Sequence, residues 1–267
     1  MRRIFGYIVL AVIFFVLILV WTLKIDASLG YSEFVSGGAL FFIMFFLFLF
    51  NMRKRLPFLP LWPAHKWFLL HTVMGFLALF LYWLHAGNLW PKGLYVQILA
   101  SLFYVTTLSG IVGLIMEKIY PNLLTRIGHE CIYERIPLDI AKIRRKSEKL
   151  VFECTEKTGS DTLAKHYLET LGWFFQRPRF FINNIFGGRD SYNWVNQQCA
   201  ILERFLNEAE SEYLEQLFTL AEMKIKIDHH YSLQTMLKSW LLVHIPLAAA
   251  AMVMSVWHLI LIQVFFN

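Results

Sequence analysis

The amino-acid sequence predicts an all-α integral membrane protein with about five transmembrane helices and a polar helical insert. Of its 267 residues, 57% are hydrophobic and 17% are aromatic. Only 16% are charged, whereas charged residues make up about 25% of an ordinary soluble domain. Runs of apolar residues long enough to cross a bilayer recur along the chain, and most charges fall in one central stretch.

The apolar runs define five expected spans. They are Ile4 to Leu23, Ser36 to Asn51, about Trp67 to Ala86, about Val96 to Met116 and about Leu237 to Phe266. The first run follows the basic start MRR, as a signal peptide would. Its apolar stretch of about 18 residues is longer than the 7 to 15 usual for a signal peptide, so we interpret it as a retained anchor. The turn AGNLWPKG ends the third span.

The expected spans divide the chain into four parts. Residues 1–52 hold two transmembrane helices, 53–117 hold the third and fourth, 118–236 form a helical domain, and 237–267 hold the last helix. Between the second and third spans, three prolines in NMRKRLPFLPLWPAHK prevent a continuous helix.

Basic residues predict the orientation. The short segments on one side carry Arg2, Arg3, Arg53, Lys54, Arg55 and Lys66, and those on the other side carry only Lys24 and Lys92. By the positive-inside rule, the N-terminus and the large central domain are cytoplasmic and the C-terminus is outside. We expect a multi-pass protein of a bacterial-type inner membrane, in contact with membrane lipid.

The polar domain is predicted to be helical. Asp139 to Lys157 is amphipathic and ends at Gly159, and a second helix, capped by Ser160 or Asp161, reaches about Gln176. The segment GWFFQRPRFFINNIFGG interleaves aromatic residues with arginines, which suits the headgroup level of a bilayer. From residue 192 to 244 there is no Pro or Gly, so one long helix, or two with a small break near His229 and His230, leads into the fifth span. The domain is either a simple helical bundle or a docking platform for a partner.

Charge and cysteine patterns exclude several classes of function. Residues 118–235 hold 16 Lys or Arg and 16 Asp or Glu, so the formal charge of +6 lies around the spans, and no basic stripe for nucleic acid remains. Cys131, Cys154 and Cys199 form no CxxC or CxxCH element, which argues against covalent c-type haem and against iron–sulfur or zinc sites. No G-x-G-x-x-G or P-loop occurs, so we expect no nucleotide module in this chain.

Two histidine pairs with the same spacing are the strongest functional signal. His71 and His85 bound HTVMGFLALFLYWLH in the third span, and His244 and His258 bound HIPLAAAAMVMSVWH in the fifth. Ionisable residues at membrane depth are costly and point to function. Fourteen helical residues advance about 21 Å and return nearly to the same face, so each helix presents two imidazoles in one direction, one toward each leaflet.

Topology pairs the histidines across the two helices. Because both spans run from the cytoplasm outward, His71 and His244 lie near the inner surface, and His85 and His258 near the outer one. Two planar macrocycles with an imidazole on each axial face would fit this arrangement. Small residues share the histidine face and leave room for macrocycle rims, although they also favour plain helix contact. The positions on this face are Gly75, Ala78, Tyr82, Ala248, Ala251 and Ser255.

Other residues have two interpretations. Ser109, Gly110 and Gly113 on the fourth span serve either the macrocycles or, as we favour, helix packing. His65 lies in the Pro-bounded loop without a partner at its depth and is interpreted as interfacial. His129, His166, His229 and His230 in the polar domain are interpreted in the same way.

At the paired histidines the chain resembles the di-haem b-type membrane cytochromes, which include respiratory cytochrome b, the cytochrome b561 group and ferric-reductase-like proteins. The segments SGIVGLIMEKIYP and KIKIDHHYSLQTMLKSWLLVHIPL resemble a bacterial branch with a large insert before the last haem helix. The resemblance implies two haem b groups with axial ligands His71, His85, His244 and His258. Lys66 and Lys238, at the inner ends of these helices, and Lys92 outside could pair with haem propionates or with lipid phosphate.

These observations predict transmembrane electron transfer. We expect electrons to pass between a quinone or cytoplasmic donor at the inner haem and a periplasmic redox protein, such as a c-type cytochrome, at the outer one. The chain would be a subunit of an oxidoreductase, without a substrate site of its own apart from a possible quinone site. Two rival hypotheses are a scaffold with incidental histidines and a metal or ion transporter with a histidine-lined path. The transporter predicts acidic or amide partners within the spans, where only Gln97 and Gln263 occur, near the ends.

Overall fold

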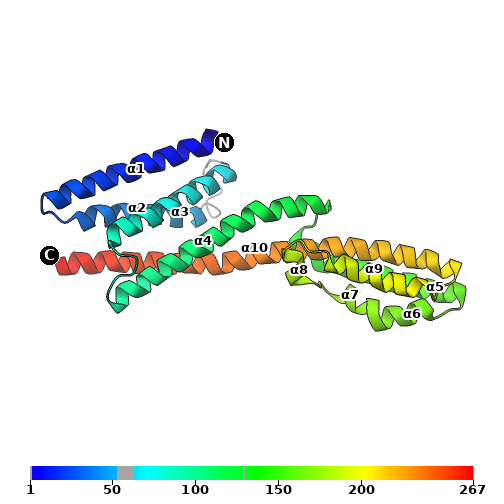
Figure 1. Ribbon diagram of the computed structural model, residues 1–267. Coiled ribbons are helices and arrows are strands. Elements are labelled where there is room, and N and C mark those ends of the chain that lie inside the picture. Colours follow the sequence, from blue (N-terminus) through cyan, green and yellow to red (C-terminus); the bar gives the residue numbers. More distant parts are fainter. Residues whose placement is uncertain (1, 53–62, 129, 267) are drawn as a thin grey trace. The chain divides into compact units, whose positions relative to one another are not determined.

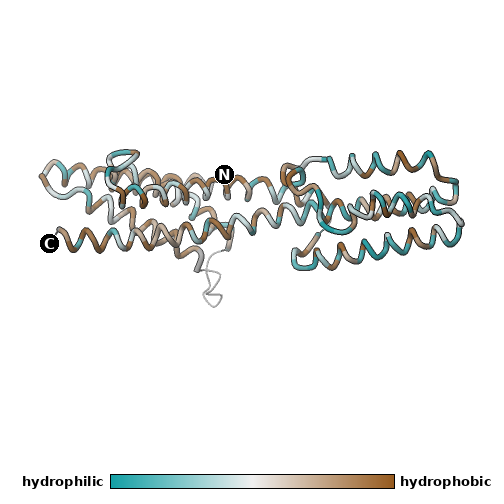
Figure 2. Tube along the Cα trace, turned by 90° about the horizontal axis from the view of Figure 1, so that it is seen from below, coloured by the Kyte–Doolittle hydropathy of each residue, from teal (hydrophilic) through white to brown (hydrophobic). Residues whose placement is uncertain are grey.

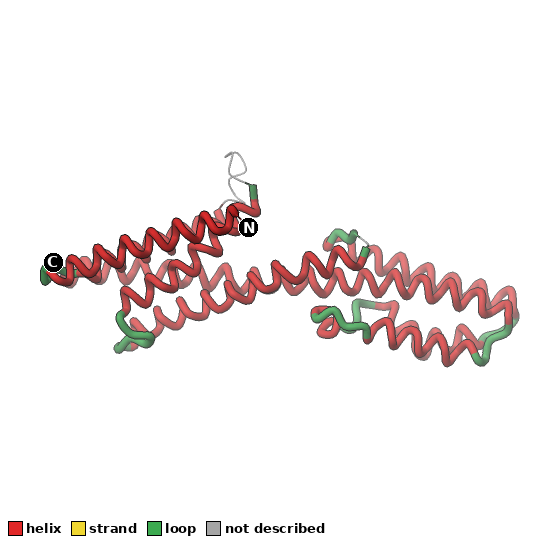
Figure 3. Tube along the Cα trace, turned by 45° about the horizontal axis from the view of Figure 1, so that its top comes forward, coloured by secondary structure: helices red, strands yellow, loops and turns green. Residues whose placement is uncertain are grey.

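The computed structural model describes residues 2–52, 63–128 and 130–266. Over these residues the chain is helical with short connecting loops and contains no strand (Figure 3). Contacts divide it into two units. The membrane unit comprises Met1–Ile115 and Trp240–Asn267, and the polar unit comprises Met116–Ser239.

Described turns end the first and third helices of the membrane unit. Helix α1 (Arg2–Ala27) and helix α2 (Ser32–Met52) are joined by a tight turn with Leu29 at φ 58°. Helix α3 (Ala64–Ala86) ends at Gly87, whose φ of 64° suits a residue without a side chain and whose N–H donates to the carbonyl of Trp83. The expected turn after the third span is confirmed.

The remaining two helices of this unit extend beyond it along the chain. Helix α4 (Leu94–Ile127) continues eleven residues past Met116, farther than the sequence predicts, and contains Pro121. Helix α10 (Glu208–Phe266) is a single helix of 59 residues that contains Pro246, so the expected long helix into the fifth span has no break near His229. It begins at Glu208 and not near residue 192, because a separate helix, α9 (Asp190–Glu203), ends before it. At about 1.5 Å per residue, α10 greatly exceeds the thickness of a bilayer core, and only its apolar C-terminal part can cross one.

Within the described residues, five helices are long and apolar enough to cross a membrane: α1, α2, α3, α4 and α10. Their apolar segments show as brown tube in Figure 2. Within the membrane unit, α3 and α10 run in the same direction and α4 runs opposite to them (Figure 1). The protein is therefore an all-α membrane protein whose two histidine-bearing helices are parallel. Leu40, Ile43, Leu77, Leu81 and Phe103 are among the buried residues that hold α2, α3 and α4 together.

The polar unit is a helical bundle around its own apolar core. Its elements are the 3₁₀ turn Tyr133–Arg135, α5 (Ile136–Thr158), α6 (Thr162–His166), a π-helical turn (Tyr167–Leu171), α7 (Gly172–Gln176), α8 (Phe181–Ile185), α9 (Asp190–Glu203) and the start of α10. Gly159 ends α5 at φ 69°, as expected. The expected second helix does reach Gln176, with the π-helical turn inside it.

A buried ion pair organises the segment that we expected at the headgroup level. Lys224 and Asp228 on α10 form an ion pair with no exposed surface. The Lys224 ammonium donates to the carbonyl of Arg177 at 2.9 Å and lies 4.0 Å from the centre of the Phe174 ring. Phe174 and Phe175 are fully buried. The prediction that this segment's rings lie in the acyl boundary is therefore wrong for both phenylalanines, because the buried pair draws the segment into the core.

Two histidines outside the four-ligand set, His65 and His230, lie in places that the sequence analysis did not predict. Pro63 precedes α3, so His65 is exposed in the first helical turn of α3 and does not lie in a loop. His230 is only 5% exposed and belongs to the interior of the polar unit, so its interfacial assignment is wrong. Residues 53–62 and His129 lie outside the described residues.

Candidate functional site

The four candidate ligands lie on regular helix, two on α3 and two on α10. Both helices run in the same direction (Figure 1), so the first histidine of the α3 pair lies at the level of the first histidine of the α10 pair. His71 and His244 line one cavity. His85 and His258 lie against each other fourteen residues further along each helix. All four imidazoles are partly buried.

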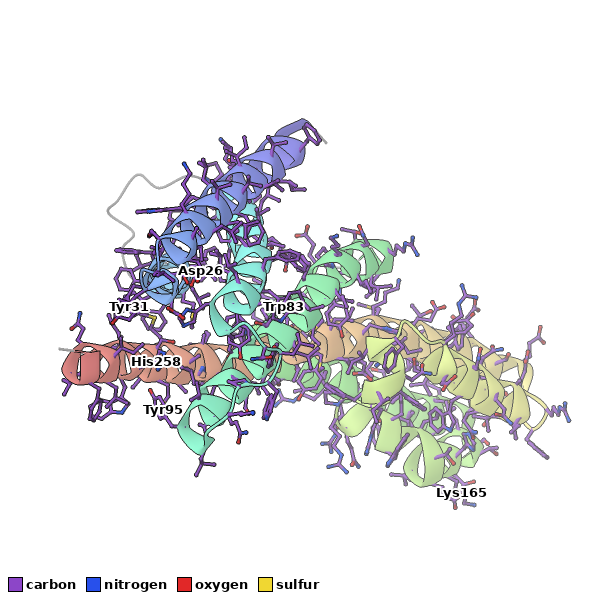
Figure 4. All side chains as sticks on the ribbon, turned by 60° about the vertical axis from the view of Figure 1, so that its left-hand side comes forward. Asp26, Tyr31, Trp83, Tyr95, Lys165 and His258 are labelled. Atoms are coloured by element: carbon purple, nitrogen blue, oxygen red, sulfur yellow. The ribbon has the colours of Figure 1, made fainter. Side chains whose placement is uncertain are left out.

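At the level of His85 and His258, the two ring centres are 6.4 Å apart and the ring planes make an angle of 78°. Two metal–nitrogen bonds of about 2.0–2.1 Å in line would separate the two nitrogens by about 4 Å and the ring centres by about 6 Å. The observed separation therefore suits a shared metal. Tyr95 from α4 stacks on His258, with ring centres 6.0 Å apart (Figure 4).

Helix α2 holds His85 from the other side. The Ser36 hydroxyl lies 3.3 Å from Nδ1 of His85. The next residue, Gly37, packs so closely on the imidazole that a Cβ there would lie 2.7 Å from Cε1 of His85. Glycine is thus required at this position for the observed position of the ring.

At the level of His71 and His244, α4 and an aromatic neighbour hold the second imidazole. The Ser109 hydroxyl is 2.6 Å from Nδ1 of His244. Trp240, one turn earlier on α10, stacks on the imidazole with ring centres 5.2 Å apart and donates its indole N–H to the Ser109 carbonyl at 2.8 Å. A Cβ at Gly113 would overlap the Trp240 indole. Ser109 therefore contacts a candidate ligand, while Gly113 serves packing.

His71 has a different environment. Its ring centre lies 4.6 Å from that of Phe50 on α2. Its Nδ1 is buried and has no hydrogen-bond partner among the described residues. A buried polar atom without a partner costs about 1–3 kcal/mol. The Thr106 hydroxyl, which lines the same cavity, is likewise buried and unpaired within the described chain. These two atoms mark the cavity as a place where a polar ligand atom or a metal would be stabilised.

The cavity between α2, α3, α4 and α10 holds about 150 Å³ and is mainly apolar. Four of the six residues predicted on the histidine face line it: Gly75, Ala78, Ala248 and Ala251. A cavity of about this volume holds a single aromatic ring such as benzene. A macrocycle is several times larger, so its binding here would require lining side chains such as Phe48, Phe68 and Phe76 to turn outward.

The donor set fits a group that brings most of its own ligands. Among the described residues there is no cluster of three or more His, Cys, Asp or Glu side chains that could hold a bare metal ion. Two histidines at each level would supply two ligands to a haem iron, which brings its remaining ligands with it. The chemistry of the paired imidazoles fits haem, while the cavity beside His71 and His244 is smaller than a macrocycle.

Two of the three lysines proposed for propionates, Lys238 and Lys66, differ in their surroundings. Lys238 belongs to the polar unit, where its ammonium is 2.8 Å from a carboxylate oxygen of Glu134 and 3.6 Å from the centre of the Tyr133 ring. The structure thus gives Lys238 an acidic partner of its own. Lys66 lies in the first turn of α3, five residues before His71.

Sequence reasoning missed the residues that support the ligands. Ser36, Gly37, Tyr95 and Trp240 each contact a candidate ligand, and none of them was singled out. The dipeptide Ser36-Gly37 within the Phe-rich second span was the available signal, because a polar and a small residue together favour close helix contact. No protein-family model, curated protein or solved structure matches the chain. The case for a function therefore rests on the arrangement of the four histidines.

Proposed function

We propose that the protein transfers electrons across a membrane through two haem b groups, one held by His71 and His244 and the other by His85 and His258. The observation that carries this proposal is the meeting of histidines at two levels of two parallel helices. Its quantitative part is the 6.4 Å separation of the His85 and His258 rings, which suits two axial ligands of one metal.

Ligation by two imidazoles favours electron transfer over chemistry on a substrate. Both axial positions are filled, so no open position remains for oxygen or another reactant. When bound, haem supplies reversible one-electron oxidation and reduction. The protein's part is to fix the imidazoles and to keep water from the apolar space between α3, α4 and α10. Apart from a quinone site, we propose no substrate site in this chain.

The distribution of basic residues supports an orientation. By the positive-inside rule, His71 and His244 lie toward the cytoplasm, and His85 and His258 toward the periplasm of a bacterial-type inner membrane. The two levels are about 21 Å apart along each helix, which matches much of the hydrocarbon core. Electrons would pass between a quinone or cytoplasmic donor and a periplasmic redox protein such as a c-type cytochrome.

The test is a reduced-minus-oxidised visible spectrum of the purified full chain, expressed with adequate haem. We expect b-type bands and two haems per chain. His71→Ala or His244→Ala should remove one haem and spare the other, and His85→Ala or His258→Ala should remove the second. His65→Ala, an exposed histidine on α3, is the matched control and should retain both. Absence of b-type bands would reject the cytochrome and leave the scaffold and transporter hypotheses.

A further inference from the structure

At each histidine level, one imidazole is backed by a serine from a different helix. Ser36 on α2 lies 3.3 Å from Nδ1 of His85, and Ser109 on α4 lies 2.6 Å from Nδ1 of His244. The other imidazole of each level is in contact with an aromatic ring: Phe50 for His71 and Tyr95 for His258. At both levels, a serine therefore contacts one imidazole and an aromatic ring contacts the other, and different residues make these contacts.

The carbonyl groups around Ser36 determine which partner donates the proton in the hydrogen bond between Ser36 and His85. Its hydroxyl lies 3.4 Å from the carbonyl of Ser32 and 3.3 Å from that of Glu33, both in its own helix. A hydroxyl has one proton. When that proton is donated to a carbonyl of α2, only lone pairs of Oγ remain for His85, so Nδ1–H of the imidazole must be the donor. Ser36 is 1% exposed, which leaves little room for competing water.

Ser109 fixes His244 through two contacts at once. Its hydroxyl meets Nδ1, and its carbonyl accepts the indole N–H of Trp240, the ring that stacks on the same imidazole. A short contact of 2.6 Å combined with a stacked neighbour leaves the imidazole little freedom to rotate. The hydroxyl and the indole thus determine both the tilt of the ring and the nitrogen that faces away from α4.

We propose that Ser36 and Ser109 are positioning residues that orient His85 and His244, and that Ser36 holds His85 in the Nδ1–H tautomer and leaves its Nε2 free for the axial bond. A hydrogen bond at one ring nitrogen sets which nitrogen binds a metal and raises the basicity of that ligand. The inference rests on the proposed function for its consequence at the haem. The choice of tautomer is a property of the chain itself and can be tested without haem.

The first experiment measures the tautomers directly. Nitrogen-15 NMR of histidine-labelled, haem-free full chain should show His85 protonated at Nδ1, and Ser36→Ala should release it toward the Nε2–H form. Ser101→Ala is the control, because the Ser101 hydroxyl donates only to the Gln97 carbonyl of its own helix, at 2.7 Å. An Nε2–H tautomer of His85 in the unsubstituted chain would overturn the proposal, whether or not the protein binds haem.

The second experiment measures the effect on the loaded protein. Loss of a ligand's hydrogen-bond partner typically weakens metal binding 10- to 100-fold. A more basic imidazole favours the ferric form, so Ser36→Ala and Ser109→Ala should each raise the midpoint potential of one haem and leave the other unchanged. A tenfold change in the ratio of ferric to ferrous affinity corresponds to about 59 mV. Ser109→Thr should restore the potential, and equal potentials in Ser109→Ala, Ser101→Ala and the unsubstituted protein would count against a positioning role.

Discussion

The imidazoles of His85 and His258 lie 6.4 Å apart although the whole polar unit, Met116–Ser239, separates them in the chain. The contact exists because α3 and α10 run in parallel and carry their histidines at equal intervals. Their supports come from two further helices, α2 through Ser36 and α4 through Tyr95. Four helices therefore determine one pair of rings.

Gly37 gives a sharp test of this packing. Gly37→Ala would place a Cβ 2.7 Å from Cε1 of His85, so the ring must move away from α2. We expect loss or spectral perturbation of the haem at this level and a lower melting temperature. Gly38→Ala is the matched control, because its Cβ meets no other atom within 4 Å. A helical Gly→Ala change gains up to about 1 kcal/mol in helix propensity, so the control should be neutral or stabilising. The same effect of both substitutions on haem content would contradict the close contact.

A substitution at Gly75 tests whether haem occupies the cavity. Gly75 lines the cavity beside His71, and a Cβ there meets nothing within 4 Å. Gly75→Leu should therefore fold normally and fill the space, so the haem content falls from two per chain toward one. Gly6→Leu on α1, which also enters open space, should leave the haem content unchanged. Two haems per chain in Gly75→Leu would locate the macrocycle elsewhere.

Replacing one residue of the buried ion pair should destabilise the polar unit more than replacing both. Removal of one partner of a buried pair typically costs about 3–5 kcal/mol, whereas an apolar pair of similar volume is often neutral. We expect Asp228→Asn and Lys224→Met to lower the unfolding midpoint strongly, and Lys224→Met combined with Asp228→Leu to recover much of it. Fluorescence of Trp173 and Trp194, whose rings pack against each other, reports the transition. Lys165→Ala breaks the exposed pair with Asp161 and should leave the midpoint unchanged (Figure 4).

Cys199 and Cys131 of the polar unit should be alkylated at different rates. Burial raises the pKa of the Cys199 thiol to about 11. At pH 8, a thiolate with this pKa is roughly two orders of magnitude scarcer than one with the ordinary value of about 8.5, so alkylation should be slower by that factor. Cys131 is only partly buried and should react first. Mass spectrometry after timed alkylation measures both rates, and faster labelling of Cys199 in the native protein would contradict its burial.

The same thiol links stability to pH. The native state holds the Cys199 proton more tightly than the unfolded chain does, because its folded pKa is the higher one. The contribution of this group to the free energy of unfolding is therefore complete below about pH 8.5 and falls as the pH rises from there toward 11. Cys199→Ala should flatten this part of the pH profile, as measured by thermal unfolding between pH 8 and 11.

The spans and the histidine faces were predictable because they depend on local properties. Apolar length determines a transmembrane helix, and fourteen helical steps determine a shared face. The extension of α4 past Met116 was not predictable from hydropathy, since its polar end is stabilised within the polar unit. The burial of Phe174 was missed for a related reason. Lys224 and Asp228 look like surface charges in the sequence, and only tertiary packing makes them a core pair.

The candidate ligands could be predicted from the sequence, whereas the residues that contact them from other helices could not. Ser36 precedes His85 by 49 positions and Ser109 precedes His244 by 135, so no local pattern connects them. The approach of α2 to α3 and of α4 to α10 creates each contact. The size of the cavity beside His71 likewise depends on how four helices pack, which composition does not determine.

The uninterrupted helix between His71 and His85 limits how this chain can change in length. One inserted or deleted residue would turn one imidazole by about 100° relative to the other and shift it by about 1.5 Å. The displaced imidazole would then be out of line with its partner on α10. The two fourteen-residue intervals are thus the stretches where insertions are least tolerable, and the loops between helices should accept changes in length more readily.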